Sequence, residues 1–485
     1  MKKNNQTMKF PYINHQIELV IEDKVYKYLK EMTRENLFES LNYIVKEVAG
    51  NANKANMKRI HFRRKDLDIL DHKEYEEGLK TFQEELNEKP EVYFQLAREL
   101  GYYVKISMYI EEENLVMMVL DNSPLLPVEV ERIREKFKKA AKFKTLEQVF
   151  AEGLDLSEGG GFGLIMTILM LRKIGVDEKV FKIMKNEKFT AIHLQLPLNL
   201  VSSQESEVIA ESIATEIDAI PQFPPHILQL QKILGDPNAE FKDLAKIIER
   251  DPALIADLLK TANSVLYALP HQVDSIEEAV KLIGFKGVGT LILTYSTQHL
   301  MMNRYRLDVI NEIMNHSAEV AFYAHEIAKI FNLKEHIDTI YLGGILHDIG
   351  KIMINALKPH MMKRIKKLCK EKGLSQNFLE QLTNGYNHAI IGGKLAEKWN
   401  FPQLLTELIR YHHVPTESQD ENFPMVSCIY LADFFYYFRR GDASYTDINY
   451  LVRQYFEITN KENFERLFKK VEDSFLKKMS RWQRV

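Results

Sequence analysis

The stretch LGGILHDIGK, residues 342–351, places a histidine next to an aspartate in a segment that is otherwise apolar enough to be buried. An ionised carboxylate is costly inside a protein unless a metal ion, a cation or hydrogen bonds compensate its charge. His347 and Asp348 could therefore hold a metal ion, or they could belong to a metal-free polar network that ties helices together. Lys351 follows one helical turn later, where its ammonium group could neutralise phosphate charge.

Further imidazole and carboxylate groups occur at wide intervals on both sides of this stretch. Glu312 and His316 are four residues apart, so they would share one face of a helix. Imidazole and carboxylate together favour Fe, Mn, Zn or Ni, whereas Mg and Ca prefer oxygen ligands. Two such ions bridged by Asp348 could activate water for attack on a phosphodiester. The candidate metal ligands are Glu312, His316, His347, Asp348, His388, His412, His413 and Asp433, and the candidate catalytic residues are Lys351 and Asp348.

The second half of the chain has the residue pattern of an all-α domain. From about residue 217 onward, apolar residues recur with helical period, and alternating strand patterns are almost absent. Asp251 followed by Pro252 is typical of a helix N-terminus. We therefore predict an all-α helical domain over residues 217–440 and a C-terminal helical extension over residues 441–485.

Six stretches of this half read, in chain order, AIPQFPPHILQLQKIL, IERDPALIADLLKTANS, SIEEAVKLIGFKGVGTLIL, YLGGILHDIGK, HAIIGGKLAEKWNFP and IRYHHVP. Together they resemble the HDOD domain, a regulatory relative of the HD superfamily of metal-dependent phosphohydrolases. The resemblance implies an interaction or output module of a bacterial signalling protein. After His413 the chain reads VPTESQDENFP, which departs from the Glu-x-x-Asp-Gly-x-Gly-Tyr-Pro run of HD-GYP phosphodiesterases, so that cyclic dinucleotide specificity is not indicated.

The first 200 residues mix two kinds of pattern and predict an α+β two-layer sandwich, a sheet covered by helices. Segments rich in β-branched and aromatic residues predict strands, and segments of helical period predict helices. The predicted strands are 58–64, 102–110, 114–121 and 189–197, and the predicted helices are 34–55, 76–100 with a break at Pro90, and 162–175.

Three pieces of this first half could bind a nucleotide. Glu47 and Asn51 share a helical face, where a carboxylate can polarise water and an amide oxygen can ligate Mg²⁺. Asp121 ends a strand and could accept from an adenine amino group. The run GGGFG, residues 159–163, opens an apolar helix, whose N-terminus favours phosphate.

This order resembles the GHKL ATPase domain of histidine kinases, Hsp90, gyrase and anti-sigma serine kinases. The resemblance implies binding of ATP with Mg²⁺. The box that normally reads Asp-x-Gly-x-Gly is DNSPL here, with Ser123 and Leu125 in place of the glycines. The alternative is a nucleotide-free fold whose glycines only form turns. The nucleotide-binding candidates are Glu47, Asn51, Lys54, Asp121, Gly159, Gly161, Gly163 and Thr190.

Composition limits the classes of function. With 485 residues the chain exceeds what one hydrophobic core usually organises, and we expect a domain at 1–200 and a linker at 201–216. A formal net charge of -3 gives no electrostatic case for a nucleic-acid partner. The basic N-terminus has no apolar h-region, and the longest apolar run, 164–171, is too short to span a bilayer. We therefore expect a cytoplasmic protein without a membrane span.

Two functions remain open at this point. The first is a bacterial signal-transduction protein in which the HDOD module acts as interaction or output domain under an ATPase-like sensor domain. It would bind a signalling protein partner, and a nucleotide could be its ligand. The alternative is a metal-dependent phosphohydrolase acting on a nucleotide or phosphodiester. The altered DNSPL box argues against ATPase or kinase activity of the first half.

Overall fold

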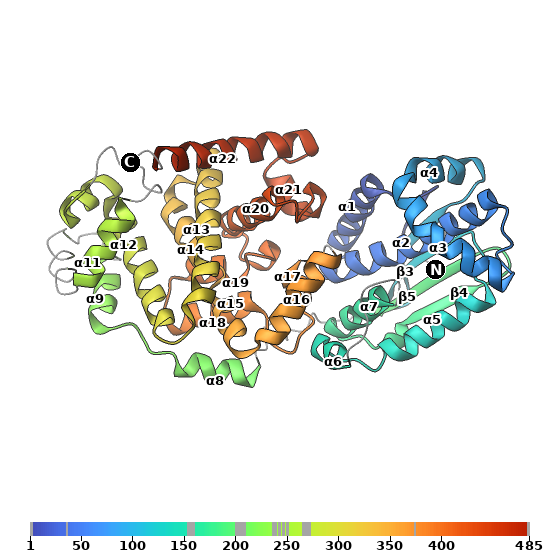
Figure 1. Ribbon diagram of the computed structural model, residues 1–485, viewed down its shortest axis with the longest axis horizontal. Coiled ribbons are helices and arrows are strands. Elements are labelled where there is room, and N and C mark those ends of the chain that lie inside the picture. Colours follow the sequence, from blue (N-terminus) through green and yellow to red (C-terminus); the bar gives the residue numbers. More distant parts are fainter. Residues whose placement is uncertain are drawn as a thin grey trace. The chain divides into compact units, whose positions relative to one another are not determined.

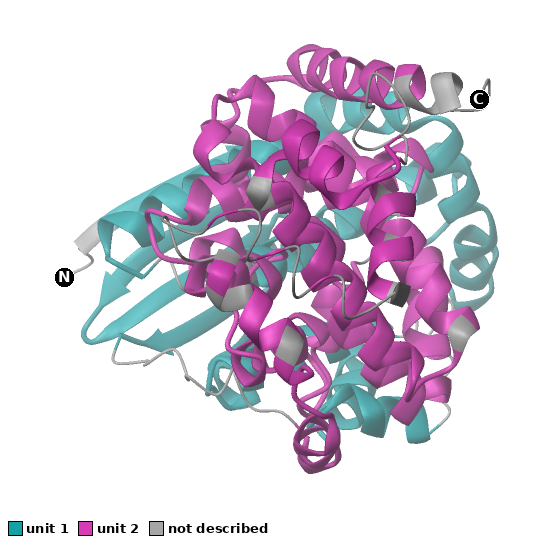
Figure 2. Cartoon of the chain, turned by 90° about the vertical axis from the view of Figure 1, so that its left-hand side faces the viewer, with its two compact units in different colours: residues 1–206 teal, residues 207–485 magenta. Residues whose placement is uncertain are grey.

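The computed structural model divides the chain into two compact units, Met1–Ser206 and Glu207–Val485 (Figures 1 and 2). Each unit has its own internal packing and is described by itself. The residues that the structure describes are 3–34, 37–152, 161–198, 210–234, 240, 244, 248, 252–263, 273–372 and 375–482.

The first unit is built on a five-stranded antiparallel sheet with strand order β1-β2-β3-β5-β4. Helix α2 packs against β2 and β3, and helices α1 and α7 pack against α2. The strands are β1 (Lys3–Phe10), β2 (Val104–Glu111), β3 (Asn114–Asp121), β4 (Phe181–Lys185) and β5 (Thr190–Pro197). The helices are α1 (His15–Glu31), α2 (Phe38–Lys65), α3 (His72–Glu88), α4 (Pro90–Glu99), α5 (Pro127–Ala140), α6 (Leu146–Ala151) and α7 (Phe162–Lys173). The predicted sheet with covering helices is confirmed.

The prediction of a strand at 58–64 is wrong, because α2 runs without interruption through this segment. The apolar and aromatic residues of this segment suggested a strand, yet Met57 and Ile60 continue the buried stripe that begins earlier in the helix. No proline interrupts the period, and the helix ends only where Asp66 adopts a left-handed conformation. The predicted break at Pro90 is confirmed, since Pro90 is the first residue of α4.

In the described residues of the second unit, all regular secondary structure is helical, as predicted. Helices α13, α14 and α20 pack together at its centre (Figure 1). Its helices are α8 (Glu211–Ala219), α9 (Pro225–Leu234), α11 (Pro252–Ala262), α12 (Ile276–Met302), α13 (Leu307–Ile330), α14 (Ile337–Leu346), α15 (Ile349–Leu357), α16 (Pro359–Lys372), α17 (Gln376–Glu380), α18 (His388–Lys398), α19 (Gln403–Arg410), α20 (Phe423–Arg439), α21 (Tyr450–Tyr455) and α22 (Lys461–Trp482).

Two parts of the chain outside the predicted helical domain also belong to this unit. Helix α22 buries Phe464 and Val471 in the core that α13 and α20 share. Helix α8 packs against α15 and α18 and begins within the predicted linker 201–216. The part of that linker at 201–209 lies outside the described residues.

Glycines in the stretch LGGILHDIGK allow neighbouring helices to approach closely at the centre of the unit. A Cβ atom on Gly344 would overlap with the backbone of Ala321 in α13. A Cβ atom on Gly350 would overlap with the carbonyl group of His388 in α18. The same stretch that carries His347 and Asp348 therefore brings α14 and α15 into backbone contact with two other helices.

Candidate metal centre

Side chains from five places in the second unit converge on Asp348. His347 and Asp348 lie at the junction of α14 and α15, where Asp348 is the N-cap of α15. His388 is the first residue of α18, and the side chain of Asn387 caps the N-terminus of this helix. The remaining convergent residues are His316 on α13, His412 and His413 directly after α19, and Asp433 on α20.

The carboxylate of Asp348 lies between two groups of potential ligands. Asp348 Oδ1 is 3.2 Å from His388 Nε2, and Asp348 Oδ2 is 3.2 Å from His316 Nε2. Within each group, the ligand atoms lie within 4.8 Å of one another. One group is His316, His347 and Asp433, and the other is Asp348, His388, His412 and His413. Asp348 Oδ2 also approaches the first group, at 3.4 Å from His347 Nε2.

Three of the histidines are oriented by partners on their far side. The Nδ1 atom of His347 is 2.7 Å from the Gly344 carbonyl oxygen, and that of His412 is 2.7 Å from the Ile409 carbonyl oxygen. A carbonyl oxygen only accepts, so Nδ1 carries a proton in both residues and Nε2 faces the centre. The Nδ1 atom of His388 bonds the carboxylate of Glu380, the last residue of α17. This arrangement is the one that orients metal-ligating imidazoles in proteins.

Glu380 is the functional residue that the sequence analysis missed. It is fully buried and also accepts from the backbone N–H of His388 at 2.9 Å. It lies eight residues before His388 in a short helix, and no motif spacing distinguishes it from other glutamates of the chain.

The electrostatics of the centre keep the carboxylate charged and part of the imidazole set neutral. Burial alone would raise the pKa of Asp348, but His347, Lys351 and His316 hold it well below its usual value. Lys351 Nζ is 2.6 Å from Asp348 Oδ2, and this carboxylate outweighs burial and raises the pKa of Lys351. Burial and the neighbouring imidazoles lower the pKa values of His412 and His413 well below normal, which favours the neutral form that metal ligands need.

Several buried polar atoms of the centre have no hydrogen bond even though they lie close to one another. Buried polar atoms without partners are rare in folded proteins and call for an explanation. A metal ion would satisfy these atoms, and their chemistry fits a divalent transition metal. The atoms are Nδ1 and Nε2 of His316, Nε2 of His347, Oδ1 of Asp348 and Oδ1 of Asp433.

Two predicted residues differ from the rest in their surroundings. Glu312 shares the helix of His316 but faces solvent, where it pairs with Lys366 at 2.9 Å. It is therefore not among the side chains that meet at Asp348. Lys351 reaches the centre, but its ammonium group is buried against Asp348.

The nucleotide-binding candidates of the first unit fall into two groups. Asn51 Nδ2 donates to Glu47 Oε1 at 3.0 Å, and a Cβ atom on Gly163 would overlap with the Glu47 carboxylate. Gly161 caps α7 in a left-handed conformation directly before this contact. In the second group, Asp121 on β3 faces Thr190 on β5 across the ladder.

Asp121 is buried, and its Oδ1 accepts from the backbone N–H of Ser123 at 3.0 Å. Thr190 Oγ1 donates to the Ser123 carbonyl oxygen at 2.7 Å, so the altered DNSPL box is tied into the sheet. Lys54 faces solvent, and Gly159 lies outside the described residues. The GHKL identity of this unit stays a prediction.

Comparison with known proteins identifies the class of the second unit. Residues 220–415 match the model of the HDOD domain. The chain is 31% identical over 435 residues to an uncharacterised protein of Treponema pallidum, covering 90% of this chain and 84% of that protein. The chain therefore belongs to the same family as that protein and carries an HDOD domain.

Two further similarities are more limited. Ribonuclease Y of Fusobacterium nucleatum is 24% identical over 182 residues, which are 38% of this chain and 29% of that enzyme. A crystal structure of an HDOD domain protein of unknown function from Geobacter sulfurreducens aligns with 22% identity and a TM-score of 0.46, covering 56% of this chain and 95% of that one. Within the described residues, every helix is too short or too polar to cross a bilayer.

Proposed function

We propose that the HDOD domain of this chain holds a pair of divalent transition metal ions and hydrolyses a phosphate ester or phosphodiester within a signal-transduction protein. The observation that carries the proposal is the sharing of Asp348 between two groups of ligand-capable side chains. Its two oxygens face opposite groups, at 3.2 Å from His316 on one side and from His388 on the other.

The residues that would hold the ions follow from these two groups. His316, His347 and Asp433 would hold one ion, and His388, His412 and His413 the other, with one Asp348 oxygen toward each. Ions at such positions supply Lewis acidity, which activates water at neutral pH and stabilises charge on phosphoryl oxygens. Of this set, His413 is the most exposed, with 16% of its side chain accessible.

The other residues of the centre act by position and charge. Glu380 keeps His388 in one orientation, as the carbonyl oxygens of Gly344 and Ile409 do for His347 and His412. Lys351 lies against the shared carboxylate, where its positive charge would offset negative charge at the centre.

The second candidate function is an output module that binds a signalling partner without turnover. It is favoured by the burial of the centre, where His347, His388 and His412 have no exposed surface. In this case the centre would stabilise the helical domain, and the first unit would act as a sensor of nucleotide or partner.

Metal analysis of the purified full chain tests the proposal. We expect two transition metal ions per chain in the wild type, and loss of metal in His347→Ala and Asp348→Asn. His360→Ala, an exposed histidine on α16, is the matched control and should retain the metal. Hydrolysis of bis(p-nitrophenyl) phosphate should disappear together with the metal. A folded protein that takes up no Fe, Mn, Zn or Ni would contradict the proposal and leave the output module.

A further inference from the structure

The formal net charge of -3 averages over a strongly basic helix in the second unit. Helix α16 has the sequence PHMMKRIKKLCKEK, with six lysine or arginine residues and one glutamate. Met362, Ile365 and Leu368 form its buried stripe, and its described charged residues are exposed. Figure 1 shows α16 beside α15, the helix that begins directly after Asp348. The basic surface of α16 therefore lies close to the metal centre.

Three lysines form a row along one side of α16. Lys363, Lys366 and Lys370 are separated by three and four residues, a spacing that places side chains on one face of a helix. All three are exposed. Among the described residues, Lys363 and Lys370 have no carboxylate partner, and Lys366 pairs with Glu312. Like charges at this spacing repel one another, so an anion with several charges would stabilise the row.

The pair of Lys366 and Glu312 places this row next to the metal centre. Lys366 Nζ is 2.9 Å from Glu312 Oε1, and Glu312 lies one helical turn before His316 on the same face of α13. His316 keeps 9% of its side chain accessible. The pair itself is exposed, at 50% for Lys366 and 71% for Glu312, and such pairs contribute little to stability. A phosphate group can therefore replace the Glu312 carboxylate at Lys366 at little cost.

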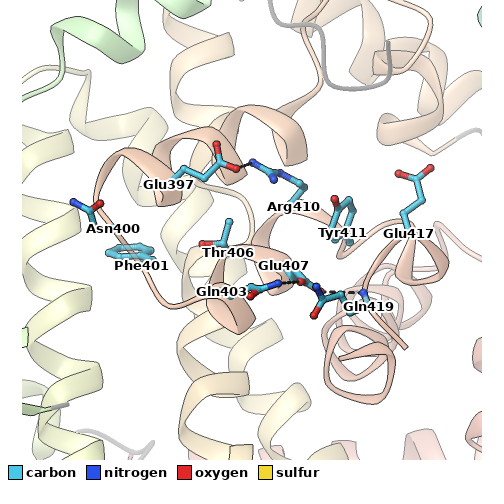
Figure 3. A pocket seen from close by; sticks show the side chains of 10 residues that line it. All are labelled: Glu397, Asn400, Phe401, Gln403, Thr406, Glu407, Arg410, Tyr411, Glu417 and Gln419. Atoms are coloured by element: carbon cyan, nitrogen blue, oxygen red, sulfur yellow. Dashed lines mark hydrogen bonds and ion pairs between the residues drawn. The ribbon is translucent and has the colours of Figure 1, made fainter. Parts of the chain in front are cut away.

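The cavity along α18 and α19 differs from this row, because its charged side chains already have partners within the protein (Figure 3). Arg410 Nη2 donates to Glu397 Oε1 at 2.6 Å, and Lys394 Nζ is 3.2 Å from Glu397 Oε2. The carboxylate of Glu407 accepts from Gln403 Nε2 at 3.1 Å. The row on α16, in contrast, has positive charge that is available to a ligand.

We propose that the substrate of the metal centre is a single-stranded nucleic acid, whose backbone phosphates bind along Lys363, Lys366 and Lys370. This inference deepens the proposed function and rests on it for the hydrolytic step. A strand has one negative charge per nucleotide, so several lysines can bind it at once. A duplex holds its phosphates on a rigid outer surface, which does not reach a centre where His347 and His388 have no exposed surface.

The reaction that follows is hydrolysis of a phosphodiester within the strand. The oxygen of one water molecule bonds to phosphorus, the ester P–O bond breaks, and a proton passes to the leaving oxygen. One product ends in a phosphomonoester and the other in a hydroxyl group, and water is the only co-reactant. Contacts to backbone phosphates do not read sequence, so the row predicts little sequence preference.

Fluorescence anisotropy with labelled single strands tests the row on the metal-free full chain. We expect oligouridylate and oligothymidylate of about 15 nucleotides to bind, with affinity at least about tenfold weaker at low salt in the double variant Lys363→Gln, Lys370→Gln. The slope of log K against log salt concentration should decrease by about 1.4 in magnitude, because two phosphate contacts are lost. Glu312→Gln frees Lys366 and should tighten binding about two- to threefold.

The double variant Lys469→Gln, Lys470→Gln removes two exposed lysines from α22 and is the matched control, which should bind as the wild type does. Thermal unfolding verifies that each variant is folded. Absence of binding to both strands at low salt, or an equal loss of affinity in the two double variants, would overturn the row. Binding of phosphatidylglycerol vesicles without binding of either strand would also overturn it and would indicate a membrane surface.

Hydrolysis by the metal-loaded full chain separates this inference from the proposed function. The ratio of kcat/KM for the strand to kcat/KM for bis(p-nitrophenyl) phosphate should fall at least about tenfold in Lys363→Gln, Lys370→Gln, because the small ester does not span the row. Hydrolysis of this ester but of neither strand would overturn the substrate and leave the proposed function. A chain that takes up no metal would contradict the proposed function, while strand binding to the metal-free chain would still decide the row.

Discussion

Asp121 in the first unit and Asp348 in the second are both buried carboxylates, yet they ionise in opposite directions. Burial raises the pKa of Asp121 to about 7, against weaker opposing contributions from the Ser123 N–H group and Arg59. The pKa of Asp348 lies well below its usual value, although this residue is buried even more completely. The difference lies in the neighbours, since Asp348 has Lys351 at 2.6 Å and several imidazoles around it.

The comparison shows that burial by itself does not decide the charge of a carboxylate. Desolvation acts on both residues, and at Asp348 a cation in contact and the hydrogen-bonding imidazoles outweigh it. In the first unit the cations Lys58 and Arg59 are bound by Glu129 and hold its pKa at about 2, against the effect of its own burial. Asp121 therefore lacks the compensation that Asp348 receives.

The largest effect is expected from removing the charge of Asp348 in metal-free protein. Asp348→Asn leaves the ammonium group of Lys351 buried without its carboxylate, which should lower the free energy of unfolding of the second unit by about 3–5 kcal/mol. Urea denaturation at pH 7 measures this change. Asp420→Asn, at an exposed loop position, should alter stability little. Equal stability of both variants would show that the charge of Asp348 does not stabilise the second unit, and would contradict the difference between Asp348 and Asp121.

The corresponding change at Asp121 should have the opposite sign. With a folded pKa of about 7 and an unfolded pKa of about 3.9, folded Asp121 keeps a proton that the unfolded chain releases. Stability is then lost as the pH rises from about 4 to about 7, by up to about 4 kcal/mol. Asp121→Asn should therefore stabilise the first unit at pH 8 and have almost no effect at pH 4. Denaturation curves at both pH values measure this, and destabilisation at pH 8 would show that the carboxylate is compensated.

A smaller effect is expected from Glu380, which acts on the centre only through His388. Glu380→Gln retains an acceptor oxygen but loses the charge that favours the His388 orientation, so metal affinity should fall about 10–100-fold. Competition with a chelator measures the affinity. Glu371→Gln, an exposed residue paired with Lys367, serves as the control. Unchanged affinity in Glu380→Gln would show that the shared carboxylate alone positions His388.

The smallest effect concerns the contact between α7 and Glu47 in the first unit. Gly163→Ala places a methyl group where the Glu47 carboxylate lies, so Glu47 must turn away from Asn51 and the free energy of unfolding should fall by about 0.5–1.5 kcal/mol. Gly50→Ala adds a methyl group to α2 where no atom lies within 4 Å, and stability should rise by about 0.5–1 kcal/mol. Thermal unfolding of both variants measures the difference. A neutral Gly163→Ala would show that Glu47 moves aside without cost.

Local sequence pattern was sufficient to predict those features that depend only on residue type and spacing along the chain. The helical period of the second half predicted an all-α unit, and the order of histidines and aspartates predicted which side chains meet. Local sequence was ambiguous at 58–64, where apolar and aromatic residues suggested a strand and the preceding helix continued. A segment of seven residues does not distinguish a strand from the last turns of a helix by composition, so the packing of Met57 and Ile60 in the core decides.

By itself, the sequence determined the helical class of the second unit, the HDOD match and seven of the convergent residues, because these depend on residue type and spacing. Only the tertiary structure decided that Glu312 points to Lys366 while Glu380 supports His388. It also decided that two buried aspartates carry different charges. Both outcomes depend on distances between side chains from separate helices and strands, and an electrostatic or hydrogen-bonding partner acts only where the fold brings it into contact.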